Sequence, residues 1–335
     1  GPMPRLRLGP APLERVARGL VETTLRPLGL PPAVLEQRPT FRVDERLPDG
    51  AVELLLRGTP VHRAALHGPP ANEPGVERLV AELSPPLIQH AAELLGLEEV
   101  QQWLDELAVQ APVTVREAVP GRIPLATFTE VLRLLLREQV PLTGIRAILS
   151  ALARPATPLP EETTPGALLP LARHASRAAL SRALAGSTSR LRCLRFDALI
   201  EDTIREARRF ASRSDTVALA PAATRDILRA LRHTLHTAAS AGQRPPATPP
   251  HGTTSPTTPP VVLLAPAELR PHVRGLIAEE FPLLPVVSAA ELLPQLELEL
   301  VGTIRLLPPA APQRGSLDPE SRGVPTALEP SATPA

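Results

Sequence analysis

His90-Ala-Ala-Glu-Leu-Leu-Gly96 opens the stretch that decides the fold, residues 90–152. Five further segments follow it in order: Gln102-Trp-Leu-Asp-Glu-Leu107, Val115-Arg-Glu-Ala-Val-Pro120, Phe128-Thr-Glu-Val-Leu132, Leu136-Arg-Glu-Gln-Val140 and Ile145-Arg-Ala-Ile-Leu149. Apolar residues recur along this stretch at intervals of three and four, which is the spacing of one face of an α-helix. The stretch therefore predicts short amphipathic helices packed into one compact unit.

The boundaries of four helices follow from capping residues and prolines. The first is expected to begin at Ser84 as N-cap and to end at Gly96. The second carries Trp103, which we interpret as a core anchor. The third begins at Pro124, and the fourth begins at Thr143 as N-cap.

These motifs, in this order and at this spacing, resemble the cytosolic domain of the type III secretion export gate protein (FlhA/SctV, the FHIPEP family). A weaker resemblance lies in Val286-Val-Ser-Ala-Ala-Glu-Leu-Leu293 and Val301-Gly-Thr-Ile304. The resemblance is good over residues 76–155, patchy over 160–306 and faint before residue 68.

The resemblance implies a docking platform at the cytoplasmic face of the bacterial inner membrane. It implies a homo-oligomeric ring, nonameric in the family, that receives chaperone and substrate complexes and passes substrates to the export channel. The export ATPase stalk and a gatekeeper protein are the further partners that it implies. The full-length protein would be embedded in the membrane through helices upstream of Met3, and residues 1–3 are interpreted as a tag-cleavage remnant.

The N-terminal part, residues 4–75, is predicted to be a small α/β subdomain containing a hairpin. Its first strand is Phe41–Leu47, its turn is Pro48-Asp49-Gly50, and its return strand carries Val52, Leu54 and Leu56 and ends at Gly58.

Only the linker Gly68–Gly75 separates this hairpin from the helix expected at Ser84, whereas the family usually inserts a small subdomain near this point. We therefore predict that the inserted subdomain is absent. In flagellar members it forms one wall of the chaperone-binding cleft, so the partner-binding cleft of this chain is unknown. A surface between the hairpin and the C-terminal part is the expected replacement, and the missing flagellar pattern favours the injectisome type.

Helical and strand patterns alternate in residues 155–307, after a helical ring-forming subdomain at 76–154. The expected elements are helix 166–185, strand 191–196, helix 197–210, strand 216–219, helix 221–239, strand 261–264, helix 266–280, strand 284–287, helix 288–293 and strand 296–306. Ser288 and Glu291 form a capping box. The fold class is thus α+β multidomain: an N-terminal hairpin domain, a central four-helix domain and a C-terminal layered α/β domain with a largely parallel sheet. The proline-rich residues 240–260 and 308–335 are predicted to be disordered.

Composition excludes several classes of protein. The chain of 335 residues has 36 basic residues, all Arg, against 35 acidic ones, so a phosphate loop with its lysine is excluded. The single Cys193 excludes an intramolecular disulfide, and no apolar run is long enough to cross a bilayer. Residues 156–245 carry 14 Arg and 8 acidic residues while 76–155 carry 7 and 10, an alternation of sign that does not indicate nucleic-acid binding.

No catalytic, cofactor-binding or metal-binding residue is assigned. His233 and His236 share a helix face, but no nearby carboxylate or thiol completes a metal site, and a solvated face is the favoured interpretation. Cys193 is interpreted as a small core residue.

Four polar residues within the best match are candidates for the ring interface: Arg116, Glu117, Arg122 and Arg146. Intersubunit ion pairing and capping or pairing within the subunit both remain open for each of them. Two other functions also remain open, a monomeric adaptor and an enzyme on the C-terminal α/β domain.

Overall fold

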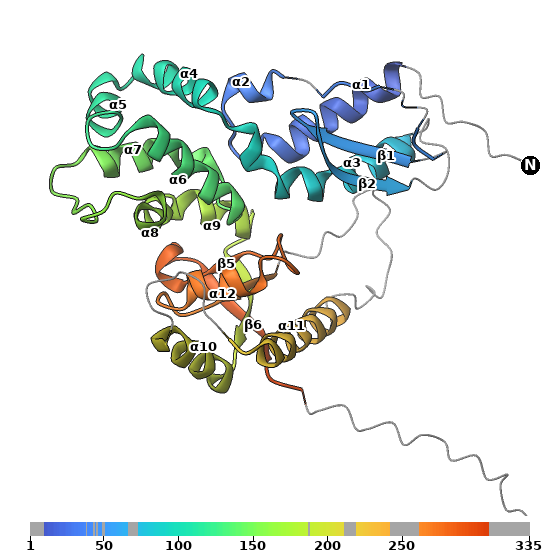
Figure 1. The fold of residues 1–335 in the computed structure, drawn as a ribbon, viewed down its shortest axis with the longest axis vertical. Helices are drawn as coiled ribbons and strands as arrows, with labels where there is room; N and C mark the ends of the chain where they lie inside the picture. The colour runs from blue at the N-terminus through green and yellow to red at the C-terminus, as the bar shows by residue number, and fades with distance from the viewer. Residues whose placement is uncertain are drawn as a thin grey trace, which may run out of the picture.

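The computed structural model describes residues 10–37, 39–42, 44, 46–48, 51–65, 73–186, 188–210, 219–241 and 261–307. The N-terminal hairpin and the middle helices lie at one end of the molecule, and the C-terminal sheet lies at the other (Figure 1). This arrangement confirms the predicted α+β class, with an antiparallel hairpin, a helical middle and a parallel sheet. Among the described residues, no helix is both long enough and apolar enough to span a membrane.

The N-terminal part places two helices and a helical turn beside one hairpin. Its elements are α1 (Pro10–Gly19), the π-helical turn η1 (Leu20–Leu25), α2 (Pro32–Leu35), β1 (Ala51–Leu56) and β2 (Thr59–Ala65).

The predicted strand pairing of the hairpin was wrong. β1 is the segment predicted as the return strand, and it pairs antiparallel with β2. The described residues within 41–47 are not in a strand, and Asp49 and Gly50 of the predicted turn lie outside the described residues. The turn is Arg57-Gly58, whose φ angles of 50° and 84° are those of the two-residue turn that matches strand twist.

Helix α3 (Glu73–Gln89) continues through Pro85 and Pro86, so the prediction of an N-cap at Ser84 was wrong. The Ser84 hydroxyl donates to the carbonyl of Val80 at 2.6 Å and shares a 2.7 Å hydrogen bond with Thr24. The buried apolar residues of α3 keep one helical face on both sides of the prolines: Val76, Leu79, Leu83 and Leu87. Burial of that face outweighs the cost of the missing backbone donors.

The middle of the chain packs around one central helix. Its elements are η2 (Ala91–Leu94), α4 (Leu97–Ala108), α5 (Pro112–Ala118), α6 (Leu125–Arg137), η3 (Leu142–Gly144), α7 (Ile145–Ala153), α8 (Pro165–Ala175) and α9 (Arg177–Ala185). α6 is that central helix, and Phe128 and Leu132 on it are 0% exposed. Trp103 is buried, which confirms the core-anchor interpretation.

Three details of the middle differ from the sequence prediction. α5 was missed as a helix, although Pro112 stands at its first position, where a proline is favoured. Gly144 rather than Thr143 precedes α7, and no side chain caps that helix. The single helix expected over 166–185 is broken at Ser176 into α8 and α9.

The C-terminal part is a four-stranded sheet in which every neighbouring pair of strands is parallel. Its elements are β3 (Arg190–Phe196), α10 (Ala198–Phe210), α11 (Pro221–Ala241), β4 (Val261–Leu264), α12 (Arg270–Ile277), β5 (Val286–Val287), η4 (Ala289–Glu291) and β6 (Glu297–Ile304). The strand order is β5-β4-β3-β6. The helices expected over 266–280 and 288–293 are shorter than predicted, the second being one 3₁₀ turn. Residues 216–218, 242–260 and 308–335, where a strand and two disordered segments were predicted, lie outside the described residues.

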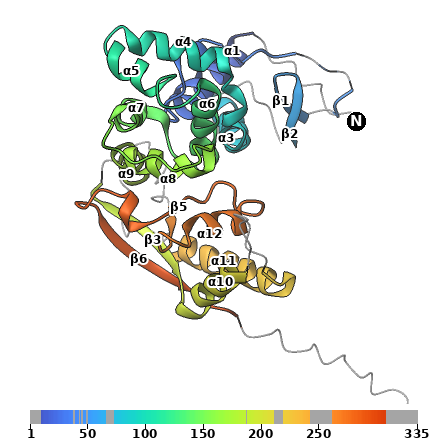
Figure 2. The ribbon, with the colours of Figure 1, turned by 60° about the vertical axis from the view of Figure 1, so that its left-hand side comes forward.

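Two hydrophobic cores meet at this sheet. One face, with Leu191 and Cys193, joins a core that extends through the middle helices to α1. The other face, with Leu194 and Phe196, packs against α10, α11 and α12. Figure 2 shows these three helices on one side of the sheet, with α8 and α9 above the sheet. The sheet is therefore the shared wall of the two cores.

Gly29 holds the N-terminal part against the middle helices. Its φ is 69°, and a Cβ there would lie 2.4 Å from the backbone nitrogen of Thr143. The carbonyl of Leu28 accepts a 2.7 Å hydrogen bond from the amide of Leu142 at the same junction.

We expect Gly29→Ala to lower the free energy of unfolding by about 3 kcal/mol, because left-handed strain adds to a backbone clash. Gly58→Ala is the matched control, since Gly58 has a φ of 84° and a Cβ added there would have no neighbouring atom within 4 Å. Gly58→Ala should lower the free energy of unfolding by only about 1 kcal/mol. Urea unfolding followed by the fluorescence of the single Trp103 measures both, and equal losses would contradict the close-contact argument.

Candidate functional site

Three of the four residues predicted for the ring interface lie around α5. Arg116 and Glu117 stand in its last turn, 72% and 56% exposed, and the closest atoms of the two charged groups are 3.7 Å apart. Arg146 lies in the first turn of α7, where its Nη2 donates to the side-chain oxygen of Gln110. These side chains present polar groups at the surface formed by α4, α5 and α7.

Arg122, the fourth predicted residue, is engaged within the subunit. Its Nη1 donates to the carbonyl of Leu152 at 2.9 Å, and its Nη2 donates to the carbonyl of Thr157 at 3.0 Å. It therefore caps the C-terminal end of α7 and holds the segment that follows. Capping was one of the two roles that the sequence left open for Arg122.

An apolar groove of about 240 Å³ lies between α4, α5 and the start of α6. Its lining is Gln101, Leu104, Asp105, Ala108, Pro112, Val115, Arg116, Val119, Pro120 and Leu125. Val109 and Val113, at the α4–α5 turn, are 84% and 60% exposed. We call the groove and these two valines the α4–α5 surface. Apolar area bordered by Asp105 and Arg116, of opposite charge, suits a protein partner.

The sequence did not single out Val109 or Val113, because neither carries a motif of its own. The only sequence signal was that both fall outside the buried face formed by Val100, Trp103 and Leu104.

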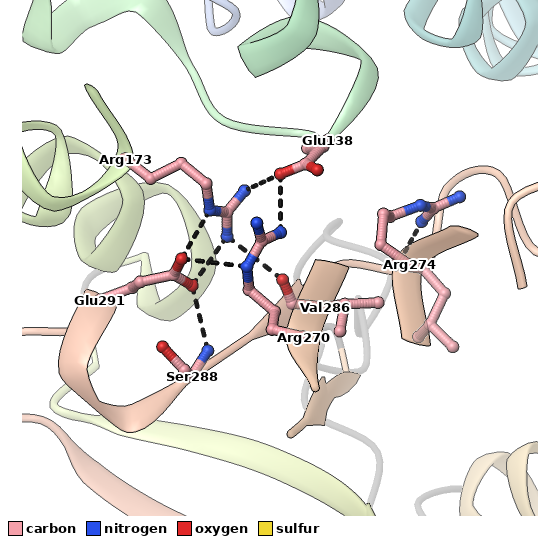
Figure 3. A network of polar contacts seen from close by, with 8 residues as sticks. Glu138, Arg173, Arg270, Arg274, Val286, Ser288 and Glu291 are labelled. Carbon is pink, nitrogen blue, oxygen red and sulfur yellow. Dashed lines mark hydrogen bonds and ion pairs between the residues drawn. The ribbon is translucent and has the colours of Figure 1, made fainter. Parts of the chain in front are cut away.

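A second polar feature is buried at the junction between the middle helices and the C-terminal sheet (Figure 3). Four side chains form it, and we call them the buried quartet: Glu138, Arg173, Arg270 and Glu291. Glu138 follows α6, Arg173 lies on α8, Arg270 begins α12 and Glu291 ends η4. Four elements that are distant in sequence therefore meet at one cluster of charges.

The geometry of the buried quartet leaves each charge paired. Arg173 donates through Nε and Nη2 to the two carboxylate oxygens of Glu291, at 2.8 and 2.9 Å. Glu138 Oε2 accepts from Nη1 of Arg173 and from Nη1 of Arg270, each at 2.7 Å. The amide of Ser288 donates to Glu291 at 3.0 Å, and the predicted capping box is confirmed.

Charge pairing overcomes burial in setting the pKa values of two members of the buried quartet, Glu291 and Arg173. Burial alone would raise the pKa of Glu291, but hydrogen bonds and charge from Arg173, with the charge of Arg270, lower it. Burial alone would lower the pKa of Arg173, but Glu291 and Glu138 raise it. Both side chains are thus held ionised in the folded protein.

Other candidate chemistry is limited in the described residues. Cys193 is 1% exposed, and burial raises the pKa of its thiol to about 11, which confirms its interpretation as a core residue. His233 is exposed on α11. Among the residues with described positions, no group of three or more His, Cys, Asp or Glu is arranged to hold a metal ion.

We expect Glu138→Ala to lower the free energy of unfolding by about 3 kcal/mol, because it leaves Arg173 and Arg270 buried with one carboxylate between them. Glu130→Ala, on α6 just before Glu138, is the matched control, since Glu130 is 41% exposed and its ion-pair partner Arg133 is 28% exposed. It should cost under about 1 kcal/mol. Urea titration of the three proteins measures the difference, and equal losses would refute the role of the quartet.

The buried quartet also predicts an acid dependence. Because the pKa of Glu291 is lowered on folding, its contribution is complete above the unfolded value of about 4.3 and is lost as the pH falls through the folded value. We expect stability to decline as the pH falls below about 5. The variant Glu291→Gln should be less stable at neutral pH but should show a flatter decline. Thermal melts from pH 7 to pH 3 measure this, and parallel curves would contradict it.

Comparison with known proteins agrees with this architecture. The FHIPEP family model matches residues 72–297, which is more than half of the chain. The flagellar biosynthesis protein FlhA of Proteus mirabilis is 34% identical over 121 residues, which are 36% of this chain and 17% of that protein. This chain thus spans less than a fifth of the length of that relative.

Two solved structures share the fold. The Chlamydia pneumoniae CdsV protein, in its complex with CdsO, has a TM-score of 0.66 and 22% identity, covering 88% of this chain and 90% of that one. The cryo-EM structure of nonameric EPEC SctV-C has a TM-score of 0.62 and 18% identity, covering 91% and 100%. The chain therefore belongs to the FHIPEP family, and it corresponds to the cytosolic domain of that family's export gate proteins, which its motifs at residues 90–152 resemble.

Proposed function

We propose that this domain is the cytosolic docking platform of a bacterial type III secretion export gate of the injectisome type. It assembles into a homo-oligomeric ring, a nonamer, at the cytoplasmic face of the inner membrane. The ring receives chaperone and substrate complexes, contacts the export ATPase stalk and a gatekeeper protein, and passes substrates to the membrane channel.

The family match over residues 72–297 carries this proposal, because it covers the helical middle together with three of the four strands of the sheet. Two structures of the same fold support the assembly and one partner. SctV-C from EPEC was solved as a nonamer, and CdsV was solved in a complex with CdsO. No described feature of the C-terminal sheet favours the alternative of an enzyme.

The α4–α5 surface is the part of this subunit that we assign to ring contacts. A ring needs a heterologous interface, in which different surfaces of neighbouring subunits meet. The apolar groove with Val109 and Val113 offers area to bury, and Arg116, Glu117 and Arg146 stand near it as polar groups that can pair with a neighbour. Arg122 contributes indirectly, by holding the end of α7.

Chaperone docking is assigned to a different surface, between the N-terminal hairpin and the C-terminal part. This assignment rests on the proposed absence of the inserted subdomain, since only residues 66–72 separate β2 from α3. Crosslinking of a bound chaperone should map to both parts. Crosslinks confined to residues 90–152 would refute this placement.

We expect Val113→Asp to weaken self-association at least about tenfold, because it places a charge in apolar area that the ring would bury. The subunit should stay folded, since Val113 is 60% exposed at the second position of α5, where an acidic residue suits the helix dipole. Leu199→Asp is the matched control, because Leu199 is 61% exposed and occupies the second position of α10.

Native mass spectrometry across a concentration series measures this, on the domain and on the full-length protein with its membrane part. Rings from the wild type and Leu199→Asp, with smaller species from Val113→Asp, are the expected result. A monomer under all conditions, including attachment to the membrane part, would contradict the ring and favour the monomeric adaptor.

A further inference from the structure

One edge of the C-terminal sheet is formed by β6. Within the sheet β6 has a single neighbour, β3, on its inner side. Figure 2 shows β6 as a long strand running along the outside of the sheet. Its first four residues, 297–300, are all exposed. An exposed edge strand offers a row of backbone groups to which another strand can pair.

The open side of β6 can be assigned to particular residues. The amide of Glu297 donates to the carbonyl of Ser189 at 2.8 Å, so the backbone of Glu297 faces inward. Because successive peptide groups alternate across a strand, the backbone groups of Leu298 and Leu300 face outward. Neither makes a backbone hydrogen bond beyond the strand ladder within the part of the chain that the structure describes.

Apolar side chains accompany these open backbone groups. Leu298 and Leu300 are 37% and 47% exposed. They lie beside Leu191 and Cys193 of β3, both buried, and therefore share the sheet face that joins the larger core. The sheet face that packs against the middle helices thus continues onto β6, where helices no longer cover it fully.

The opposite face of the edge is acidic. Glu297 pairs with Arg190 across the two strands at 3.1 Å. Glu299 lies beside Arg192, whose Nη2 instead donates to the carbonyl of Ala238 at 3.4 Å. Glu299 makes no ion pair with any side chain whose position is described. The edge therefore carries one carboxylate without a cation and two leucines without full cover.

The inner neighbour shows which sequence complements this edge, because Arg190-Leu191-Arg192 of β3 lies beside Glu297-Leu298-Glu299 of β6. We propose that the open edge of β6 binds an extended segment of a partner polypeptide in which Arg or Lys alternates with aliphatic residues. The segment adds a strand to the sheet, with its backbone on Leu298 and Leu300, its basic side chains on Glu297 and Glu299, and its aliphatic side chains over the leucines.

A second copy of β6 is a poor occupant of the same edge. When two antiparallel copies share at least two residue pairs of 297–300, every alignment that sets Leu beside Leu also sets Glu beside Glu, and the other alignments set Glu beside Leu. Like charges directly opposite each other are destabilising, and a Glu beside a Leu forms neither an ion pair nor an apolar contact. Charge therefore favours a basic partner over a second copy of β6. Binding of such a segment to β6 does not depend on ring formation.

The probe is a blocked, fluorescein-labelled octapeptide of alternating Arg and Leu, whose binding to the domain is followed by anisotropy. We expect saturable binding and slowed hydrogen exchange at the amides of Leu298 and Leu300. Two control peptides should bind at least about tenfold more weakly: one N-methylated at alternate backbone amides, and one of the same composition with its Arg residues clustered. Equal binding by either control would overturn strand addition.

The matched protein variants are Glu299→Arg and Glu279→Arg, which make the same charge change at two exposed sites. Glu299→Arg should weaken binding about tenfold while Glu279→Arg leaves it nearly unchanged, with melting temperatures confirming that both are folded. Equal loss in both variants, or none in either, would overturn the site, since binding would then follow net charge. Protection that appears away from β6 would overturn it as well, and formation of peptide-independent dimers through β6 would identify a second copy as the occupant.

Discussion

The buried quartet of Glu138, Arg173, Arg270 and Glu291 is the interaction on which the relative placement of helices and sheet depends. Charges removed from water are tolerated only when every partner is in position, because an unpaired buried charge costs several kcal/mol. A small rotation of the sheet against α6 and α8 would separate Arg270 from Glu138 and Arg173 from Glu291. Apolar contacts alone would resist such a rotation less sharply, since they have little directionality.

The larger hydrophobic core is continuous from the N-terminal part through the middle helices to the sheet. It contains Val16 of α1, Phe128 of α6 and Leu191 of β3, so the three parts distinguished by sequence share buried surface. Gly29 adds a backbone contact between the N-terminal part and η3. The α4–α5 surface and the β6 edge therefore belong to one connected framework, and their separation is set by packed elements rather than by linkers.

Regular periodicity was the predictable part of this structure, and long-range pairing was not. The apolar faces of α4, α6 and α7, and the four parallel strands, follow from patterns within a few residues. The hairpin was misaligned because Pro48-Asp49-Gly50 is a stronger local turn signal than Arg57-Gly58, although the pairing of β1 with β2 selects the latter. The prolines in α3 led to the wrong prediction of a helix start at Ser84 for the same reason. Leu83 and Leu87 are buried against elements that local sequence does not reveal. Of the buried quartet, only Glu291 had a local sequence signature, which is its capping box with Ser288.

The absence of lysine bears directly on the buried quartet. Arg173 uses three separate nitrogens to reach both oxygens of Glu291, one oxygen of Glu138 and the carbonyl of Val286. A lysine would direct its donors from a single nitrogen, and it could not span two carboxylates in a planar, bidentate arrangement. The guanidinium also holds its proton at any pH at which the protein is folded, so acid acts on this junction through its carboxylates, and Glu291 is one of them. A composition bias that looks like a property of the whole chain thus supplies the geometry that fixes the helices to the sheet.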